Sequence, residues 1–356
     1  MRILQLAPQD DSPPFELQVR ALEARGIECT TVTVPGSVGP NTSRSVVDYL
    51  RFHPAVLRES FGSYDLVHAN YGLTVPFALA QPRLPVVCSL WGSDLDGELG
   101  WISRHAARFC EATIVMSERM RHSLGRPAHV IPHGVDLDVF RPQPRSSAVA
   151  ELDWDPDARH VLFPYKPDRT VKHYERAARI VEAVDDACAT PVTLQTAEGV
   201  PHERMSTYMN AADCLLLTSR REGSPNVVKE ALACNLPVVS TDVGDVRERI
   251  DGVVPSAVCE TDGALRQAVQ TIVERGERSN GRAQATEIDA ERMAADLEAV
   301  YRSVADERSV RTRPHADRMD EDRVADESEN RSNADSIESD PVTALRTVDR
   351  SSRIRR

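Results

Sequence analysis

The amino-acid sequence predicts an α/β protein of two similar halves, each built on a parallel sheet, followed by a tail without regular structure. Short apolar runs alternate with helical patterns in both halves, which is typical of parallel strands buried on both faces. The first half opens with such a run at residues 2–7, and the second half opens with another at 160–163. With 356 residues, the chain has room for two domains and a tail.

The first half is expected to begin as strand, helix and strand. Residues 2–7 form the first strand, 8–14 a loop with two aspartates and three prolines, 15–25 a helix and 28–34 the second strand. A further helix is expected over 44–61, and an ordinary amphipathic helix is favoured there over a segment that faces a membrane or an acceptor.

The second half contains the clearest pattern in the chain, at residues 212–240. An apolar run is followed by Arg-Glu-Gly-Ser-Pro at 221–225 and by a helical pattern that begins about Pro225–Asn226, with Ser224 as its expected cap. This arrangement points a helix N-terminus out of the carboxyl edge of a strand. Such a terminus suits phosphate because its backbone N–H groups are unpaired and positively polarised.

Two carboxylates flank this helix start. Glu222 lies in the loop and Glu230 about one turn into the helix, so both can face one ligand. Carboxylates accept hydrogen bonds, and vicinal hydroxyl groups donate them. The pattern therefore favours a ligand that carries both phosphate and hydroxyl groups.

The segment EGSPNVVKEALACNLPVVSTDVGD resembles the signature of retaining glycosyltransferases of family 4, the group 1 type. The resemblance covers residues 1–303 and is clear again at 129–142, which contain Ile-Pro-His-Gly-Val-Asp. It implies the GT-B fold, in which two Rossmann-like domains face each other across a cleft. The implied parts are an N-terminal acceptor domain (1–142), a C-terminal donor domain (143–286), a closing helix that crosses back (287–303) and a disordered charged tail (304–356).

The resemblance implies transfer of a sugar from a UDP- or GDP-linked donor, with retained anomeric configuration and without a metal or other cofactor. The acceptor it implies is a glycan or a lipid-linked molecule, in the assembly of a surface polysaccharide, a glycolipid or a glycoprotein glycan. Two alternatives stay open: a GT-B protein that binds a sugar nucleotide without catalysis, and a UDP-sugar 2-epimerase.

The residues that the resemblance implicates fall into three groups. The catalytic group comprises Glu222, Arg169 and Lys172, with both cations in the loop after the strand at 160–163. The donor-binding group comprises Glu230, Gly223, Ser224, Pro225, Asn226, Val227 and Lys166. On the acceptor side, Trp91 is expected to stack on a sugar ring and Asp94 to orient a hydroxyl group, although a packed tryptophan and a turn aspartate are equally favoured.

The sequence departs from the family pattern at several places. Trp91 stands where the family often has histidine, His133 stands where it usually has asparagine, and the loop at 8–14 lacks the usual glycines. The first and third departures motivate the non-catalytic alternative. No phosphate contact is therefore expected from the loop at 8–14.

Composition limits the partners and the environment. The net charge of −12 argues against a nucleic-acid partner. Lysine and arginine number 43 together, and only Lys166, Lys172 and Lys229 are lysines, which favours a halophilic host or a GC-rich genome.

Seven scattered cysteines suit a reduced cytosol rather than a disulfide framework or a zinc site. No signal peptide or 18-residue apolar window is present, so a cytoplasmic protein is expected, with peripheral association at the inner membrane face left open.

Overall fold

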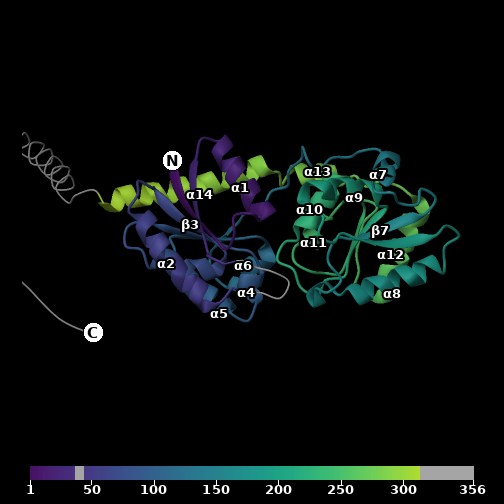
Figure 1. Ribbon diagram of the computed structural model, residues 1–356, viewed down its shortest axis with the longest axis horizontal. Coiled ribbons are helices and arrows are strands. Elements are labelled where there is room, and N and C mark those ends of the chain that lie inside the picture. Colours follow the sequence, from purple (N-terminus) through teal and green to yellow (C-terminus); the bar gives the residue numbers. More distant parts are fainter. Residues whose placement is uncertain (37–43, 313–356) are drawn as a thin grey trace, which may run out of the picture. The chain divides into compact units, whose positions relative to one another are not determined.

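The computed structural model describes residues 1–36 and 44–312. Residues Met1–Asp306 form one compact unit that contains two parallel sheets, and a second unit begins at Glu307. Figure 1 shows the two sheets in the N-terminal and C-terminal halves of the first unit. The expectation of two Rossmann-like halves is confirmed.

The N-terminal sheet has six parallel strands in the order β2-β1-β3-β4-β5-β6. Every residue of β3, β4 and β5 is buried, because helices cover both faces of the sheet. The strands are β1 (Arg2–Ala7), β2 (Glu28–Thr33), β3 (Leu66–Asn70), β4 (Val86–Leu90), β5 (Ala112–Val115) and β6 (His129–Val130).

The helices of the N-terminal half pack in two layers. α1, α6 and α14 share an apolar cluster on one face of the sheet, and α2 and α3 contribute to a second cluster on the other. α1 begins at Pro13, two residues earlier than expected, because proline is well suited to the first turn of a helix. The elements are α1 (Pro13–Ala24), α2 (Val46–Ser60), η1 (Gly72–Thr74), α3 (Val75–Leu79), α4 (Ser93–Asp96), α5 (Gly100–Ala106), η2 (Ala107–Phe109) and α6 (Glu118–Leu124).

The C-terminal sheet has five parallel strands in the order β11-β10-β9-β7-β8. α8 and α12 cover one face, and α9 and α10 cover the other (Figure 1). The strands are β7 (Arg159–Phe163), β8 (Val192–Thr196), β9 (Cys214–Leu217), β10 (Val238–Ser240) and β11 (Ala257–Val258). The helical elements that follow β6 along the chain are α7 (Arg145–Glu151), η3 (Thr170–Lys172), α8 (Tyr174–Asp185), η4 (His202–Arg204), α9 (Met205–Ala211), α10 (Asn226–Ala233), α11 (Val246–Arg249), α12 (Asp262–Arg275), α13 (Arg282–Thr286) and α14 (Ala290–Thr312), the last of which packs on the N-terminal half.

The two sheets share one connection pattern. In each, the first strand lies between the second and the third, so the chain changes direction between β1 and β3 and again between β7 and β9. Open α/β sheets bind ligands outside the carboxyl ends of the strands at such switch points. The fold therefore offers one ligand-binding crevice in each half.

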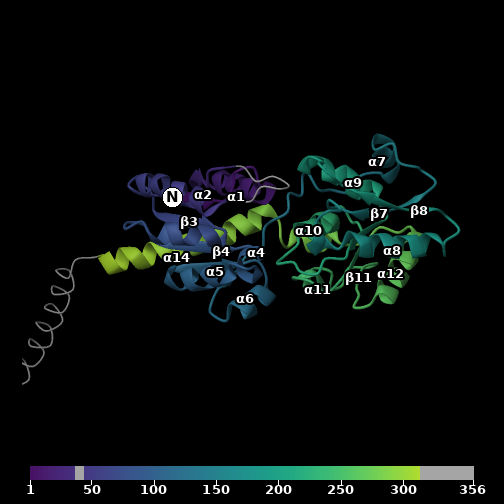
Figure 2. The ribbon, with the colours of Figure 1, turned by 60° about the horizontal axis from the view of Figure 1, so that its bottom comes forward.

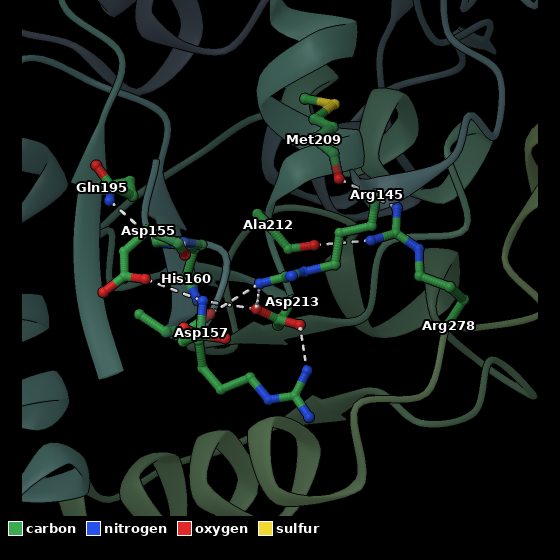
Figure 3. A network of polar contacts seen from close by, with 11 residues as sticks. Arg145, Asp155, Asp157, His160, Gln195, Met209, Ala212, Asp213 and Arg278 are labelled. Atoms are coloured by element: carbon green, nitrogen blue, oxygen red, sulfur yellow. Dashed lines mark hydrogen bonds and ion pairs between the residues drawn. The ribbon is translucent and has the colours of Figure 1, made fainter. Parts of the chain in front are cut away.

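The segment 143–157, whose prolines, serines and aspartates are typical of a linker, is instead folded onto the C-terminal half. It contains α7, and the guanidinium group of Arg145 donates to the Asp213 carboxylate at 3.0 Å. Asp213 also accepts hydrogen bonds from Arg159 and from the backbone N–H of His160 (Figure 3). The charge of the buried Asp213 carboxylate is compensated by the guanidinium groups of Arg145 and Arg159. The contact with Arg145 holds α7 beside β7 and β9.

The closing helix is longer than expected. α14 covers Ala290–Thr312 instead of 287–303, so residues 304–312 are helical and not part of an irregular tail. In Figures 1 and 2 its residues 290–306 run along the N-terminal half, and the fully buried Tyr301 hydroxyl lies 2.7 Å from Nδ1 of His68. His68 is therefore a structural residue. The rest of the expected tail, 313–356, lies outside the described residues.

Two further features concern the environment of the chain. All seven cysteines are free of disulfide bonds. Within residues 1–36 and 44–312, no helix combines the length and the apolarity that crossing a bilayer requires.

Candidate active site

The C-terminal switch point holds a buried ion pair. Nζ of Lys172, after β7, lies 2.5 Å from Oε1 of Glu222, after β9. The two side chains are only 7% and 13% exposed. Burial lowers the pKa of Lys172, and the charge of Glu222 opposes that shift. Two of the three expected catalytic residues are therefore in direct contact.

The backbone around Lys172 is held by specific contacts. Lys172 ends the short turn η3, and the next residue, His173, has a left-handed φ of 60° that redirects the chain into α8. The hydroxyl of Thr218, directly after β9, donates to the carbonyls of Lys172 and His173 at 3.0 Å. These contacts connect the two loops that meet at the switch point.

Tyr165 lies beneath the cations and was not expected from the sequence. Nζ of Lys172 is 3.9 Å from the ring centroid, and the Arg169 guanidinium carbon is 5.6 Å from it. Burial raises the pKa of Tyr165 well above its usual value, and the charges of Glu222 and Glu230 add to the shift. Its position in the loop after β7 could have suggested a role, since aromatic faces attract cations.

The other two basic candidates are more open to solvent. Arg169 is exposed and contacts Tyr165 through its guanidinium group. Lys166 is 41% exposed and lies 3.4 Å from Glu198, which is itself 62% exposed. Both residues stay near the switch point, but neither is enclosed as Lys172 is.

Glu230 is paired with a histidine that the sequence reasoning missed. Nε2 of His202 lies 2.8 Å from Oε1 of Glu230. Burial alone would lower the pKa of His202, but the hydrogen bond and the charge of Glu230 outweigh it and raise the pKa above its usual value. His202 follows β8, and the carboxyl ends of β7, β8 and β9 lie at the same edge of the sheet. This position after a strand is the sequence signal that could have identified His202.

The residue that caps helix α10, in the loop between Glu222 and Glu230, differs from the expected one. Pro225, rather than Ser224, is the N-cap of α10, and it forms no side-chain capping bond. The Ser224 hydroxyl instead donates to Asp245 at 2.8 Å. Proline fixes the extended backbone that a cap position needs, which leaves the serine side chain free for Asp245.

The middle of this loop contacts the N-terminal half. A Cβ on Gly223 would lie 2.7 Å from the carbonyl oxygen of Trp91, and the Ser117 hydroxyl donates to the Gly223 carbonyl at 3.2 Å. In the helix that follows, Val227 is buried and the Asn226 side-chain oxygen accepts from Nζ of Lys229 at 3.1 Å.

Three cavities lie within or between the two halves of the first unit. One of about 760 Å³ is bounded by both halves and opens onto His202, Asp10 and Asp11, so the acidic loop rims it. A smaller one is lined by His202, Asn226 and Glu230. A third, of about 670 Å³, lies in the N-terminal half and is lined by Trp91. Within the described ranges, no cluster of three or more potential metal ligands occurs, and metal-independent chemistry stays a prediction.

Asp94 has a structural role that replaces the expected one. Its carboxylate is 3% exposed and accepts hydrogen bonds from the backbone N–H groups of Gly72, Trp91 and Gly92 at 2.6–2.8 Å. Burial raises its pKa to about 6 despite these three donors. Since its oxygens face the backbone, Asp94 positions the loops after β3 and β4 instead of orienting an acceptor.

Two of the departures from the family pattern lie against each other. The rings of Trp91 and His133 meet edge to face, with centroids 4.9 Å apart. Nζ of Lys229, fully buried, donates to the His133 carbonyl at 3.0 Å, and burial lowers the pKa of Lys229 to about 8. Lys229 therefore has a structural contact away from Glu222, unlike Lys172.

Two open parallel sheets, with charged loops at the carboxyl edge of the second, define a glycosyltransferase fold of the GT-B type. Solved structures share it. Sucrose-phosphate synthase from Thermosynechococcus elongatus has a TM-score of 0.67 at 18% identity, covering 85% of this chain and 99% of that one. HepE from Anabaena, in complex with UDP, has a TM-score of 0.63 at 16% identity, covering 85% and 100%.

Family models identify the group more closely. The model described as Glycosyltransferase Family 4 matches residues 4–139, and the model described as Glycosyl transferases group 1 matches residues 173–275. Both models describe glycosyltransferases, so the chain is similar to this group in each of its halves. A GDP-mannose-dependent alpha-mannosyltransferase of Mycobacterium tuberculosis is 29% identical over 207 residues, which are 52% of this chain and 54% of the relative. The chain spans about half the length of the curated relatives it matches.

Proposed function

We propose that this chain transfers a hexosyl group from a UDP- or GDP-linked sugar to an acceptor hydroxyl, with retention of anomeric configuration. The observation that carries the proposal is the buried pair of Lys172 and Glu222 at the C-terminal switch point. An enclosed cation suits a diphosphate, and an enclosed carboxylate suits sugar hydroxyls. The similarity of both halves to glycosyltransferase models supports the same proposal.

The chemistry assigns separate roles to these residues. The bond between the anomeric carbon and the β-phosphate oxygen breaks, and a bond to the acceptor oxygen forms on the same face of the sugar. The acceptor proton passes to the departing phosphate oxygen. Lys172 and Arg169 stabilise the charge that the diphosphate gains, which lowers the barrier because that charge is larger in the transition state.

Glu222 and Glu230 would bind different parts of the donor. Glu222 accepts hydrogen bonds from the sugar, and Lys172 can keep its contact with Glu222 while donating to phosphate, since an ammonium group has three donors. Glu230 binds the ribose hydroxyls, with His202 as its partner in the structure. Lys166 and the loop amides at 223–227 extend this donor site.

The nucleotide is proposed only as UDP or GDP. One relative is named for GDP-mannose and one structural neighbour was solved with UDP, and the test therefore includes both. We place the activity in the assembly of a surface or lipid-linked glycan at the cytoplasmic side of a membrane, without a metal ion.

The test is a thermal-shift and calorimetric panel of UDP, GDP, ADP and their common sugars. One nucleotide is expected to stabilise the protein, and Glu230→Gln should weaken its binding roughly tenfold because a charge-assisted hydrogen bond is lost. The matched control is Glu182→Gln, since Glu182 is exposed on α8. If no nucleotide binds the parent protein, the donor site does not exist.

Transfer itself needs a second readout. Release of nucleoside diphosphate from the stabilising donor, with a sugar product of the donor's own anomeric form, is expected over an acceptor panel. Binding without release over that panel would instead establish the non-catalytic alternative. Conversion of the donor to its epimer without acceptor would establish the 2-epimerase.

A further inference from the structure

The N-terminal switch point carries an apolar cavity of about 670 Å³. It is lined by residues that directly follow three neighbouring strands: Pro8 after β1, Tyr71 after β3 and Trp91 after β4. This is the place where the fold predicts a ligand. The cavity lies on the side that the family resemblance gives to the acceptor.

Aromatic rings and hydrocarbon dominate its walls. Tyr49 and Phe77 stack at 5.9 Å between ring centroids, and Tyr71 and Trp91 meet edge to face at 6.1 Å. Leu73 and Ile102 are also among the lining residues. A sugar-binding subsite needs several convergent polar groups beside an aromatic face, and this lining provides few.

Exposed apolar side chains belong to the lining or directly neighbour it in the sequence. Leu99 belongs to the lining and is 50% exposed, and Trp101, in the same helical region, is 67% exposed. Leu50, next to the lining residue Tyr49, is 61% exposed. Exposed apolar groups gathered beside an apolar cavity are typical of a site for an amphiphile.

Two observations indicate a ligand site rather than a packing defect. Tyr71 has a φ of 91°, which is unfavourable for a bulky residue and is found where function requires strain. Nε1 of Trp91 is buried and has no hydrogen-bond partner among the described residues. Arg44 adds a cation to the lining, and its Nε also lacks a partner within the part of the chain that the structure describes.

The cavity adjoins the proposed reaction centre. The backbone of Trp91 and Gly92 approaches Gly223 so closely that a Cβ on Gly92 would lie 2.9 Å from Cα of Gly223. Gly223 directly follows Glu222. The wall of the cavity that Trp91 forms therefore lies beside the loop that would hold the donor sugar.

We propose that this cavity binds the hydrocarbon chain of a lipid-linked acceptor, with Arg44 contacting an anionic head group. The inference rests on the proposed function, because it names the acceptor class for the same reaction. The chain fills the aromatic cavity, and the head group extends toward the Glu222 loop. Asp94 acts as a positioning residue, since it holds the loops that carry Tyr71 and Trp91.

The test measures binding of farnesyl phosphate by calorimetry, with farnesol, inorganic phosphate and a water-soluble disaccharide as comparators. Farnesyl phosphate should bind at least roughly tenfold more tightly than phosphate or the disaccharide, because its chain buries apolar surface. The double variant Leu73→Gln/Leu99→Gln should lose roughly tenfold of that affinity. Phe109→Gln is the matched control, since Phe109 is 64% exposed in the same half and is not part of the lining.

A second variant tests the head group. Arg44→Gln should reduce the preference for farnesyl phosphate over farnesol and leave farnesol binding unchanged. Equal binding of farnesyl phosphate and inorganic phosphate would overturn the proposal, as would a disaccharide that binds as tightly and is equally sensitive to the double variant.

Nucleotide binding is measured on the same samples. Nucleotide binding without farnesyl phosphate binding would reject the lipid acceptor and leave the proposed transfer standing. Farnesyl phosphate binding without any nucleotide binding would show a lipid site in a protein that is not a transferase, and so would reject the acceptor assignment.

Discussion

The two switch points have the same topology and opposite chemistry. Between β1 and β3, the loops present tyrosine, tryptophan and hydrocarbon around a cavity. Between β7 and β9, they present an enclosed lysine and glutamate only 2.5 Å apart. The comparison teaches that strand order determines where a ligand binds, whereas the side chains that follow each strand decide which ligand it is.

The largest effect is expected from removing the lysine charge at the C-terminal switch point. Lys172→Met should lower nucleoside diphosphate release by roughly 10²–10³-fold, since one preorganised donor to a developing anion is lost. Lys166→Met makes the same chemical change at a half-exposed site and should cost less than about threefold. An equal loss in both variants would contradict the difference we draw between the enclosed and the open lysine.

Folding of the Lys172 variant needs its own check. Lys172→Met leaves the Glu222 carboxylate buried without its partner, which destabilises the protein. The double variant Lys172→Met/Glu222→Gln should recover much of the stability in urea denaturation without recovering activity. Recovery of activity would contradict the catalytic roles of both Lys172 and Glu222.

A smaller effect should follow from disturbing the contact between the loops of the two switch points. Gly223→Ala places a Cβ 2.7 Å from the Trp91 carbonyl oxygen and should cost about 1–3 kcal/mol in the free energy of unfolding. Gly263→Ala is the matched control, because nothing lies within 4 Å of its Cβ and the helix α12 favours alanine. Calorimetric unfolding of both variants compares them, and an unaffected Gly223→Ala would contradict the contact.

The smallest effect concerns pH at the C-terminal switch point. The pKa of His202 is raised in the folded protein, so its contribution to stability is complete below about pH 6.5 and is lost as the pH rises through the folded value. His202→Gln should therefore lower the urea midpoint more at about pH 5.5 than at about pH 9. A difference that is the same at both pH values would show that Glu230 does not hold the proton on His202.

Much of the fold could be predicted from local patterns. Apolar runs located the buried strands, and the break at residues 221–225 located the start of α10 within one residue. The enclosure of Lys172 also agrees with its place in a loop after a strand, because such loops meet at one edge of a parallel sheet.

The errors share a physical cause, which is contact between residues far apart in the chain. Ser224 was expected to cap a helix, but Asp245 provides a better partner 21 residues away. The composition of segment 143–157 is typical of a linker, but Arg145 in this segment donates a hydrogen bond to the buried carboxylate of Asp213. Trp91 and His133 looked like two unrelated departures, although their rings pack together. Local patterns do not contain these pairings.

The burial of lysines has a practical consequence for chemical labelling. Of the three lysines in the chain, Lys229 and Lys172 are buried and Lys166 is 41% exposed at its side chain. An amine-reactive dye should therefore modify Lys166 before the other two, without mutagenesis. Since Lys166 lies in the loop after β7, such a dye would report directly on whether the proposed donor site is occupied.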